Sequence, residues 1–409
     1  MRTVIRNGNV LDTVSMTFVG ERAVVIEDGV IVEVDERQDG KGEIDVEVDA
    51  RGRFVLPGLI DGHMHFRLAT MNFHALASWS EVEFGIHMAA LSRNTIERGF
   101  TTVRDLGGDV TGLMRAIASG ATLGPRIVRA GRMLTQTGGH GDAEGGEREV
   151  PACGCAMRSS TFSIVADGAE AVRKAARHNL REGSDFLKVH VSGGVASPSD
   201  PLDSVQYTPG ELEAAVLEAR HRGTYVAAHA YSAEAIQQAV AAGVHSIEHG
   251  NLIDAQTAQQ LADAGSVLVP TLVTYEAMDQ LGEQLGLPKA NRDKNTVVYE
   301  AGLASLEIAD AAGVTMGLGT DLIGETQWMQ NRELAIRAEV QSAEAILRSM
   351  WDTNARLCRL EGQVGVVAPG AFGDIVVSNV NPLDDIAAFA EPSTSLSHVI
   401  QAGRLMVDR

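Results

Sequence analysis

The amino-acid sequence predicts an α/β protein: a (β/α)8 barrel of the TIM type with a small β-sandwich domain formed from both chain termini. Between residues 56 and 363, short apolar runs alternate with longer stretches that carry helix start and stop signals. This alternation is typical of a parallel sheet with crossover helices. At both ends, residues 1–55 and 364–409, short runs alternate apolar and polar residues between turns, as half-buried antiparallel strands do.

The terminal β domain is predicted from matching strand patterns at the two chain ends. Neither end carries enough chain to bury a core easily by itself, so we expect the two ends to pair. Their alternating runs are residues 3–6, 23–26, 31–34, 373–377 and 397–400.

Eight strand candidates make up the predicted barrel, and eight βα units are the number that closes one. Helix start signals occur at Asp167 and Thr208, each followed three residues later by glutamate. Active sites of such barrels lie at the C-terminal strand ends. The long connections 132–166 and 273–290 are therefore expected to be substrate-binding segments or lids. The strand candidates are residues 56–66, 101–106, 126–131, 185–192, 225–231, 245–249, 266–272 and 315–321.

The composition favours a small-molecule partner. The chain has 409 residues, a formal net charge of -20 and a pI near 5.0, which argues against binding to nucleic acid or to anionic membranes. Residues 1–3 lead into a strand without a signal-peptide core, and no apolar run approaches the ~18 residues that span a bilayer. We therefore expect a cytoplasmic protein. The odd cysteine count predicts free thiols at Cys153, Cys155 and Cys358.

Two histidines at the end of the first barrel strand are the strongest candidates for metal ligands. Side chains alternate between the faces of a strand, so His63 and His65 point the same way while Met64 faces the packing behind them. Such a pair can also be a partly buried polar pair. The metal interpretation is favoured because further ligand types follow near the ends of later strands, and imidazole and carboxylate are ligands of zinc. These residues are Lys188, His229, His249 and Asp321.

In this order and on these strands, the six residues resemble the ligand set of the amidohydrolase superfamily of binuclear metallohydrolases. The resemblance covers essentially the whole chain, because that family also has a β domain assembled from both termini, and residues 365–376 resemble its return into this domain. It implies two divalent metal ions, expected to be zinc. His63, His65 and Asp321 would bind the more buried ion, and His229 and His249 the more exposed one. Lys188 would be carboxylated and bridge the two, since a free ammonium would be repelled by both cations.

The implied chemistry is attack by a metal-bound hydroxide on a carbonyl carbon. Asp321 would take the proton of that hydroxide and pass it to the departing nitrogen. His140, in a glycine-rich stretch after the third strand, resembles the substrate-polarising histidine of the branch that includes imidazolonepropionase and certain dipeptidases; it could also be a simple turn residue. His190 shares a strand face with Lys188, so we expect it in the pocket and not as a ligand.

Two stretches, 229–232 and 319–325, resemble the prolidase-like and the arginine or lysine carboxypeptidase members of this branch. Tyr231 lies two residues after His229, so its hydroxyl could bind the free carboxylate of a dipeptide; alternatively it packs against a loop. An arginine or lysine at the cleaved end would need an acid in the pocket, and proline would need an apolar pocket. The candidate acids are Glu325, Asp142, Glu144 and Glu147. The candidate apolar residues are Val195, Leu322, Ile323, Trp328 and Met329.

We favour proline as the cleaved residue. The alternatives are an Xaa-Arg or Xaa-Lys dipeptidase, a cyclic-amide or lactone hydrolase similar to imidazolonepropionase, and a non-catalytic scaffold of the same fold. A scaffold of this kind would be expected to lack ligands, and none of the six is missing here. A homo-oligomer is also expected, because residues 80–98 carry more apolar side chains than one barrel face needs.

Overall fold

The computed structural model describes residues 1–36, 43–76, 78–142, 162–197 and 200–409. The predictions for Glu144, Glu147, Cys153 and Cys155 therefore lie outside the described residues. Within the described part, helices that are both long and apolar enough to cross a membrane are absent.

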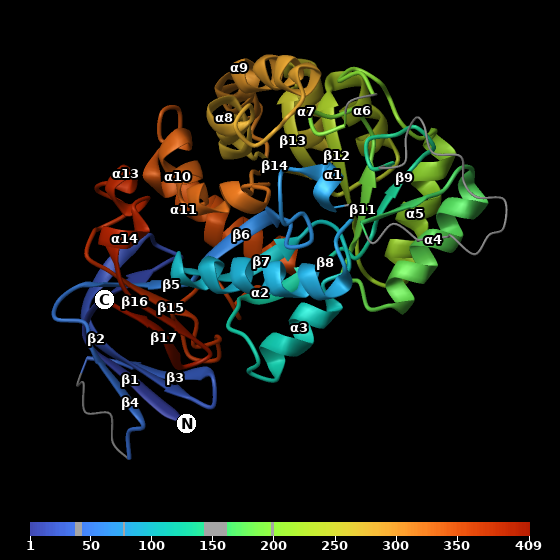
Figure 1. Ribbon diagram of the computed structural model, residues 1–409. Coiled ribbons are helices and arrows are strands. Elements are labelled where there is room, and N and C mark those ends of the chain that lie inside the picture. Colours follow the sequence, from blue (N-terminus) through green and yellow to red (C-terminus); the bar gives the residue numbers. More distant parts are fainter. Residues whose placement is uncertain (37–42, 77, 143–161, 198–199) are drawn as a thin grey trace.

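Strands from both chain ends form one eight-stranded sheet, which lies at one end of the molecule together with both termini (Figure 1). The two ends meet where β5 pairs with β15 in antiparallel register, with Leu56 opposite Val376. Both ends therefore share one β unit, as expected, while its division into the two sheets of a sandwich stays a prediction. The strands are β1 (Arg2–Asp12), β2 (Thr17–Glu27), β3 (Val30–Asp35), β4 (Val46–Asp49), β5 (Phe54–Pro57), β15 (Ile375–Ser378), β16 (Leu396–Gln401) and β17 (Arg404–Asp408).

The middle of the chain forms two parallel sheets, as the strand and helix alternation predicts. One has the order β6-β7-β8 and the other the order β10-β9-β11-β12-β13-β14. Strands β6, β7 and β11 are buried along their whole length, as expected for parallel strands that are covered on both faces. The strands of the two sheets are β6 (Leu59–Met64), β7 (Phe100–Asp105), β8 (Arg126–Arg129), β9 (Met133–Thr135), β10 (Ser163–Val165), β11 (Leu187–His190), β12 (Val226–Ser232), β13 (Ser246–Leu252) and β14 (Val267–Val269).

The eighth predicted strand, residues 315–321, is an extended segment and not a regular strand. It still runs between β14 and β6: Met316 forms a parallel bridge with Leu268, and the amide of Asp321 donates to the carbonyl of His63 at 2.7 Å. Gly319 brings the segment so close to β6 that a Cβ on it would lie 2.5 Å from Cβ of His63. A continuous hydrogen-bonded ring is not seen among the described residues, so the closed barrel stays a prediction.

Helices follow most of the parallel strands. The capping box predicted at Thr208 is confirmed at the start of α5, where Thr208 and Glu211 bind each other. The start predicted at Asp167 is wrong: Gly168 is the N-cap of α4, and Asp167 accepts the amide of Thr137 at 2.9 Å. The helices between β6 and β14 are α1 (Phe73–Leu76), α2 (Glu81–Glu97), α3 (Thr111–Ala118), α4 (Ala169–Arg181), α5 (Pro209–His221), α6 (Ala233–Ala241) and α7 (Ala255–Asp263).

The loop predicted at 273–290 is mostly helical. Helix α8 (Leu272–Leu281) starts directly after β14, and helix α9 (Lys289–Ala311) packs against it. The first seven residues of α8 are all buried, so the absence of an obvious polar face hides this helix from a pattern search. The remaining helices are α10 (Arg332–Arg337), α11 (Ala343–Arg348), α12 (Asn354–Cys358), α13 (Ile386–Phe389) and α14 (Pro392–Ser395), with short helical turns at η1 (Gly324–Met329) and η2 (Ser349–Thr353).

Helix α2 has an exposed apolar pair. Phe84 and Met88 are buried against the core, whereas Val82 is 71% and Ile86 64% exposed. Some of the apolar side chains noted in residues 80–98 are therefore exposed at the surface of the chain. The homo-oligomer stays a prediction.

Candidate metal centre

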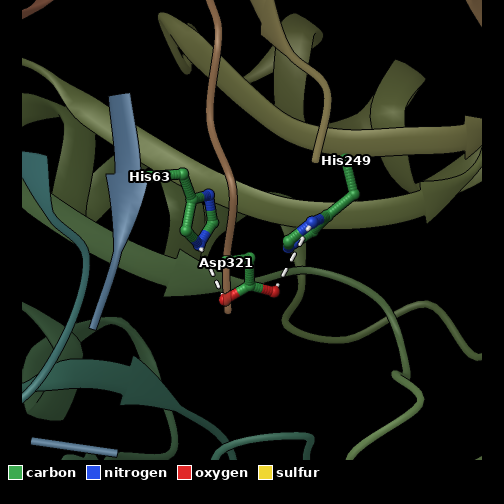
Figure 2. Close-up of side chains that lie close together, drawn as sticks. All are labelled: His63, His249 and Asp321. Carbon is green, nitrogen blue, oxygen red and sulfur yellow. Dashed lines mark ion pairs between the residues drawn. The ribbon is translucent and has the colours of Figure 1, made fainter. Parts of the chain in front are cut away.

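Three of the predicted ligands, His63, His65 and His249, lie around the carboxylate of Asp321, and Figure 2 shows His63 and His249 beside it. Nε2 of His63 and Nε2 of His65 lie 3.5 Å and 3.3 Å from Oδ1 of Asp321. Nδ1 of His249 lies 3.9 Å from Oδ2, on the other side of the carboxylate. One ligand atom from each of His63, His249 and Asp321 falls within 4.8 Å of the others. Imidazole nitrogens and a carboxylate at this spacing fit a divalent ion such as zinc.

The alternation predicted for the first barrel strand is observed. The rings of His63 and His65 lie on one side, with centroids 5.3 Å apart, and Met64 is buried in the main hydrophobic cluster. Two of the four candidate ligands on other segments have left-handed backbone conformations, with φ +74° at His249 and +50° at Asp321. Such conformations are uncommon outside glycine and concentrate at functional sites.

Three histidines each have one ring nitrogen held by a protein oxygen. Nδ1 of His63 lies 2.8 Å from Oε2 of Glu248, and Nδ1 of His249 lies 2.8 Å from Oγ1 of Thr271. Nε2 of His229 lies 3.1 Å from the carbonyl oxygen of Gly193. In each ring the second nitrogen is left for another ligand. This arrangement fixes the orientation and proton position of histidines that bind metals.

The charges of the site also suit metal binding. Burial lowers the pKa of His63 to about 4, and it lowers the pKa values of His229 and His249 well below the usual range, so these imidazoles are neutral. Burial alone would raise the pKa of Asp321, but the neighbouring His63 and His65 hold it below its usual value. Neutral imidazole and ionised carboxylate are the forms that bind a metal.

Lys188, on β11, is buried in the same centre. Burial lowers the pKa of its ammonium group to about 8, although Glu248 and Asp321 counteract the shift. In the described part of the chain, no hydrogen bond or ion pair is found for this amine. A sizeable neutral fraction near pH 8 is what a lysine needs to react with carbon dioxide.

A buried ion pair beneath the ligands was not predicted from the sequence. Nη2 of Arg104 lies 2.6 Å from Oε1 of Glu248, and both side chains are fully buried. Arg104 also donates to the carbonyl oxygen of Gly62, next to the first ligand. Glu248 thus connects His63 to a fixed cation. A possible signal was its position, since a glutamate directly before His249 inside an apolar strand must find a buried partner.

His140 lies beside the candidate ligand His229, and its ring contacts other side chains. Its ring stacks on that of His229 with centroids 4.4 Å apart, and its Nδ1 lies 3.5 Å from Oδ2 of buried Asp200. A Cβ at Gly194 would come within 2.1 Å of the ring, so the glycine is required there. His190 approaches His140 edge-on at 5.2 Å, which agrees with its expected place in the pocket.

Tyr231 also reaches the centre. Its ring centroid lies 4.8 Å from that of His229 and 5.3 Å from that of His249. The Tyr231 oxygen accepts a hydrogen bond from the hydroxyl of Tyr275 at 2.9 Å and another from the amide of Val195. Burial raises the pKa of Tyr231 above its usual value, so the phenol stays protonated.

The candidate specificity residues divide into groups. Glu325 is exposed, and its carboxylate accepts hydrogen bonds from the Thr70 hydroxyl at 2.6 Å and from the Met71 amide at 3.0 Å. The carboxylate of Asp142 accepts a hydrogen bond from the Gly138 amide at 2.8 Å. Both acids are therefore engaged by neighbouring residues. Val195 and Ile323 pack with Tyr231 and Tyr275. Leu322 and Met329 pack in a neighbouring cluster. The expectation for Trp328 as a pocket residue is wrong, because it is 64% exposed and belongs to neither cluster.

Comparisons with known proteins agree with this geometry. The model of the amidohydrolase family matches residues 54–406. An ochratoxinase of Aspergillus niger is 30% identical over 363 residues, which are 86% of this chain and 75% of the relative. A crystal structure of a prolidase complexed with N-methylphosphonate-L-proline is 40% identical, covers 100% of both chains and has a TM-score of 0.94. A Xaa-Pro dipeptidase with bound methionine is 29% identical over 99% of both chains, with a TM-score of 0.86.

Proposed function

The chain belongs to the amidohydrolase family, and we propose that it is a binuclear metal-dependent dipeptidase that hydrolyses the amide bond of Xaa-Pro dipeptides. Membership in this family supports amide hydrolysis. The narrower proposal is supported by likeness to a prolidase and to a Xaa-Pro dipeptidase over essentially the whole chain.

One observation carries the proposal of a metal centre. His63, His229 and His249 each commit one ring nitrogen to a protein oxygen and keep the second nitrogen for another ligand, and the second nitrogen of His63 lies 3.5 Å from Oδ1 of Asp321. We propose that His63, His65 and Asp321 hold one divalent ion and that His229 and His249 hold the second. Carboxylated Lys188 lies between them in this proposal. Two such ions supply a bound water of lowered pKa for attack on the substrate carbonyl.

The residues of the chain then have separate roles. Asp321 is an anion beside the ligands, so it can accept a proton during attack and return it to the departing nitrogen. His140, stacked on His229, can donate to the oxygen that gains negative charge at the substrate carbonyl. Tyr231 is proposed to bind the α-carboxylate of the dipeptide, because its ring lies beside those of both His229 and His249 and its hydroxyl is protonated.

The surroundings of Tyr231 favour proline over arginine or lysine at the cleaved end. Its cluster is composed largely of apolar residues, including Met71, Val195 and Ile323. The two described candidate acids, Glu325 and Asp142, are engaged by neighbouring backbone amides. A cationic side chain would lack a free acid among these candidates, whereas a compact apolar ring can be buried there.

Two measurements test the proposal. Metal analysis by plasma emission, on protein purified without chelator, is expected to find about two equivalents per chain; a metal-free, active enzyme would contradict it. A substrate panel of Xaa-Pro, Xaa-Arg, Xaa-Lys and Xaa-Leu dipeptides, their C-terminal amides, imidazolonepropionate and simple lactones then tests specificity. We expect Xaa-Pro to be cleaved and its amide to resist. Activity on the ring compounds alone would refute the peptidase while leaving the metal chemistry intact.

We also propose that the enzyme is a cytoplasmic homo-oligomer. The exposed pair Val82 and Ile86 on α2 supports an assembly surface. Light scattering at micromolar concentration is expected to give a mass above that of one chain, and a monomer would overturn the proposal.

A further inference from the structure

We propose that Tyr275 is a positioning residue that strengthens binding of the substrate α-carboxylate by acting through Tyr231. The inference rests on the proposed function, because it assumes that Tyr231 is the carboxylate-binding group. It assigns a role to helix α8, in a stretch that the sequence predicts to be a substrate-binding segment or a lid.

A chain of hydrogen bonds connects a ligand histidine to Tyr231. Nδ1 of His249 lies 2.8 Å from the hydroxyl of Thr271. The Thr271 hydroxyl is hydrogen-bonded to Tyr275. The Tyr275 hydroxyl donates to the Tyr231 oxygen at 2.9 Å. All four side chains are almost completely buried, with relative exposures of 0 to 3%.

The donors in this chain point in one direction. Tyr275 spends its only hydrogen on Tyr231, so its oxygen accepts from Thr271. The Thr271 hydroxyl also has only one hydrogen, and therefore it must accept from Nδ1 of His249. Nε2 of His249 is then unprotonated and available to a metal ion, which agrees with the proposed role of this histidine.

The last member of the chain has an unused donor. The Tyr231 oxygen accepts from Tyr275 and from the amide of Val195. Within the described residues, no acceptor is found for its own hydrogen. Hydrogen bonds in series polarise one another in a buried setting. Two incoming bonds therefore make the Tyr231 hydroxyl a stronger donor and hold it in one orientation, which suits a carboxylate.

The position of Tyr275 follows from the helix start. Thr271 precedes α8, and Tyr275 lies one turn later on the same side. The carbonyl of Tyr275 accepts from Asn295 of α9 at 3.0 Å, and its ring packs in the cluster of Tyr231, Val195 and Ile323. A phenylalanine would keep this packing and lose only the hydroxyl, so Tyr275→Phe isolates the proposed effect.

The test is a double-mutant cycle on purified enzyme with an Xaa-Pro dipeptide. Tyr231→Phe is expected to raise KM about 10- to 150-fold, as for a charge-assisted hydrogen bond. Tyr275→Phe is expected to raise KM about 2- to 13-fold, as for a neutral one, with kcat within about twofold. Because Tyr275 acts through Tyr231, the double variant should be no weaker than Tyr231→Phe alone. Tyr299→Phe, an exposed tyrosine on α9, is the matched control and should leave KM unchanged.

A binding measurement complements the kinetics. Free L-proline carries the same carboxylate, and its dissociation constant from calorimetry should rise by the same factors as KM in the two single variants. Thermal unfolding of each variant shows whether the fold is intact. If Tyr275→Phe does not fold, Tyr275→Met, which also lacks the hydroxyl, provides a second variant with the same expected rise in KM and in the L-proline dissociation constant.

The outcomes separate the two proposals. The role of Tyr275 would be overturned if Tyr275→Phe raised KM equally on the wild-type and Tyr231→Phe backgrounds. It would also be overturned if Tyr275→Phe left both KM and the affinity for L-proline unchanged. In either case Xaa-Pro cleavage would stand. A wild-type enzyme that cleaves no dipeptide overturns both the proposed function and this inference. A raised KM that disappears on the Tyr231→Phe background supports the inference.

Discussion

The two sides of the site are held in place by different parts of the molecule. The inner side, His63 and Asp321, is supported from within the strands, because the fully buried Glu248 and Arg104 hold His63 and the amide of Asp321 donates to the carbonyl of His63. His249 lies between the two sides, since Thr271 at the start of α8 holds its Nδ1. The outer side, His140 and Tyr231, is supported from outside the strands by Asp200 and by Tyr275 of helix α8. We infer that His63 and Asp321 on one side, and His140 and Tyr231 on the other, have separate supports, with His249 and His229 connecting the two sides.

Helix α9 extends the outer support. The Lys294 ammonium donates to the carbonyl oxygens of Gly194 at 3.2 Å and Ser197 at 2.9 Å, and Asn291 donates to that of Val195 at 2.6 Å. The same short segment contacts His229 through Gly193 and His140 through Asp200. A loop after β11 therefore places several groups of the outer side at once.

The largest effect is expected at the point where the two sides meet. Lys188→Ala should lose metal and activity together, since the proposed bridge is gone. Short carboxylic acids at millimolar concentration are expected to restore part of both. Metal content and turnover are measured on the same preparation. Retention of two metals and full activity would show that Lys188 does not bridge.

The inner side can be tested without removing most of its ligands. Asp321→Asn should lower kcat by about 10³ or more, because the proton carrier is lost, while much of the metal stays bound. The measurement is steady-state turnover together with metal analysis. Turnover within about tenfold of wild type would exclude Asp321 from proton transfer.

Glu248→Gln tests the support of the inner side. The substitution removes the charged partner of His63 and leaves Arg104 buried without its counter-charge. We therefore expect a loss of about 10- to 100-fold in metal affinity or activity. The expected loss of folding stability is about 3–5 kcal/mol, measured by denaturant unfolding. Glu344→Gln is the control, because Glu344 and Arg348 form an exposed ion pair on the surface and its loss should change little. Equal losses of metal affinity, activity and stability in Glu248→Gln and in the control variant would show that Glu248 has no special role in supporting the inner side.

Asp200→Asn tests the support of the outer side. His140 would lose its carboxylate partner but keep its stacking on His229, so kcat is expected to fall about tenfold with metal content unchanged. Asp203→Asn, an exposed acid nearby, serves as the control. If Asp200→Asn instead lost metal, the two sides would not be independently supported.

The smallest effect is expected at Glu325. This residue is engaged by Thr70 and Met71 through its two carboxylate oxygens. A glutamine can still accept the Met71 amide with its oxygen and donate its NH2 to the Thr70 hydroxyl. Glu325→Gln should therefore leave the ratio of kcat/KM for Xaa-Pro to kcat/KM for Xaa-Arg within about twofold of the wild-type ratio. A selective loss of Xaa-Arg cleavage would place Glu325 in the specificity pocket after all.

The sequence by itself determined much of the inner side. Two histidines separated by one residue must share a strand face, and parallel strands bring their C-terminal ends to one edge. These local rules place His63, His65, His229 and His249 near one another without knowledge of the full fold. The pairing of the chain ends in one sheet follows in the same way from alternation at residues 1–55 and 364–409.

Only the tertiary structure decided the outer side. The alternation of β11 suggests where His190 points, but no periodicity relates His140 to Asp200, or Tyr231 to Tyr275, because each pair joins separate elements. Trp328 lies outside the pocket, and α8 occupies the stretch expected to be a loop. The physical reason is that strand geometry repeats along the chain, whereas contacts between loops and helices depend on how whole elements pack in space.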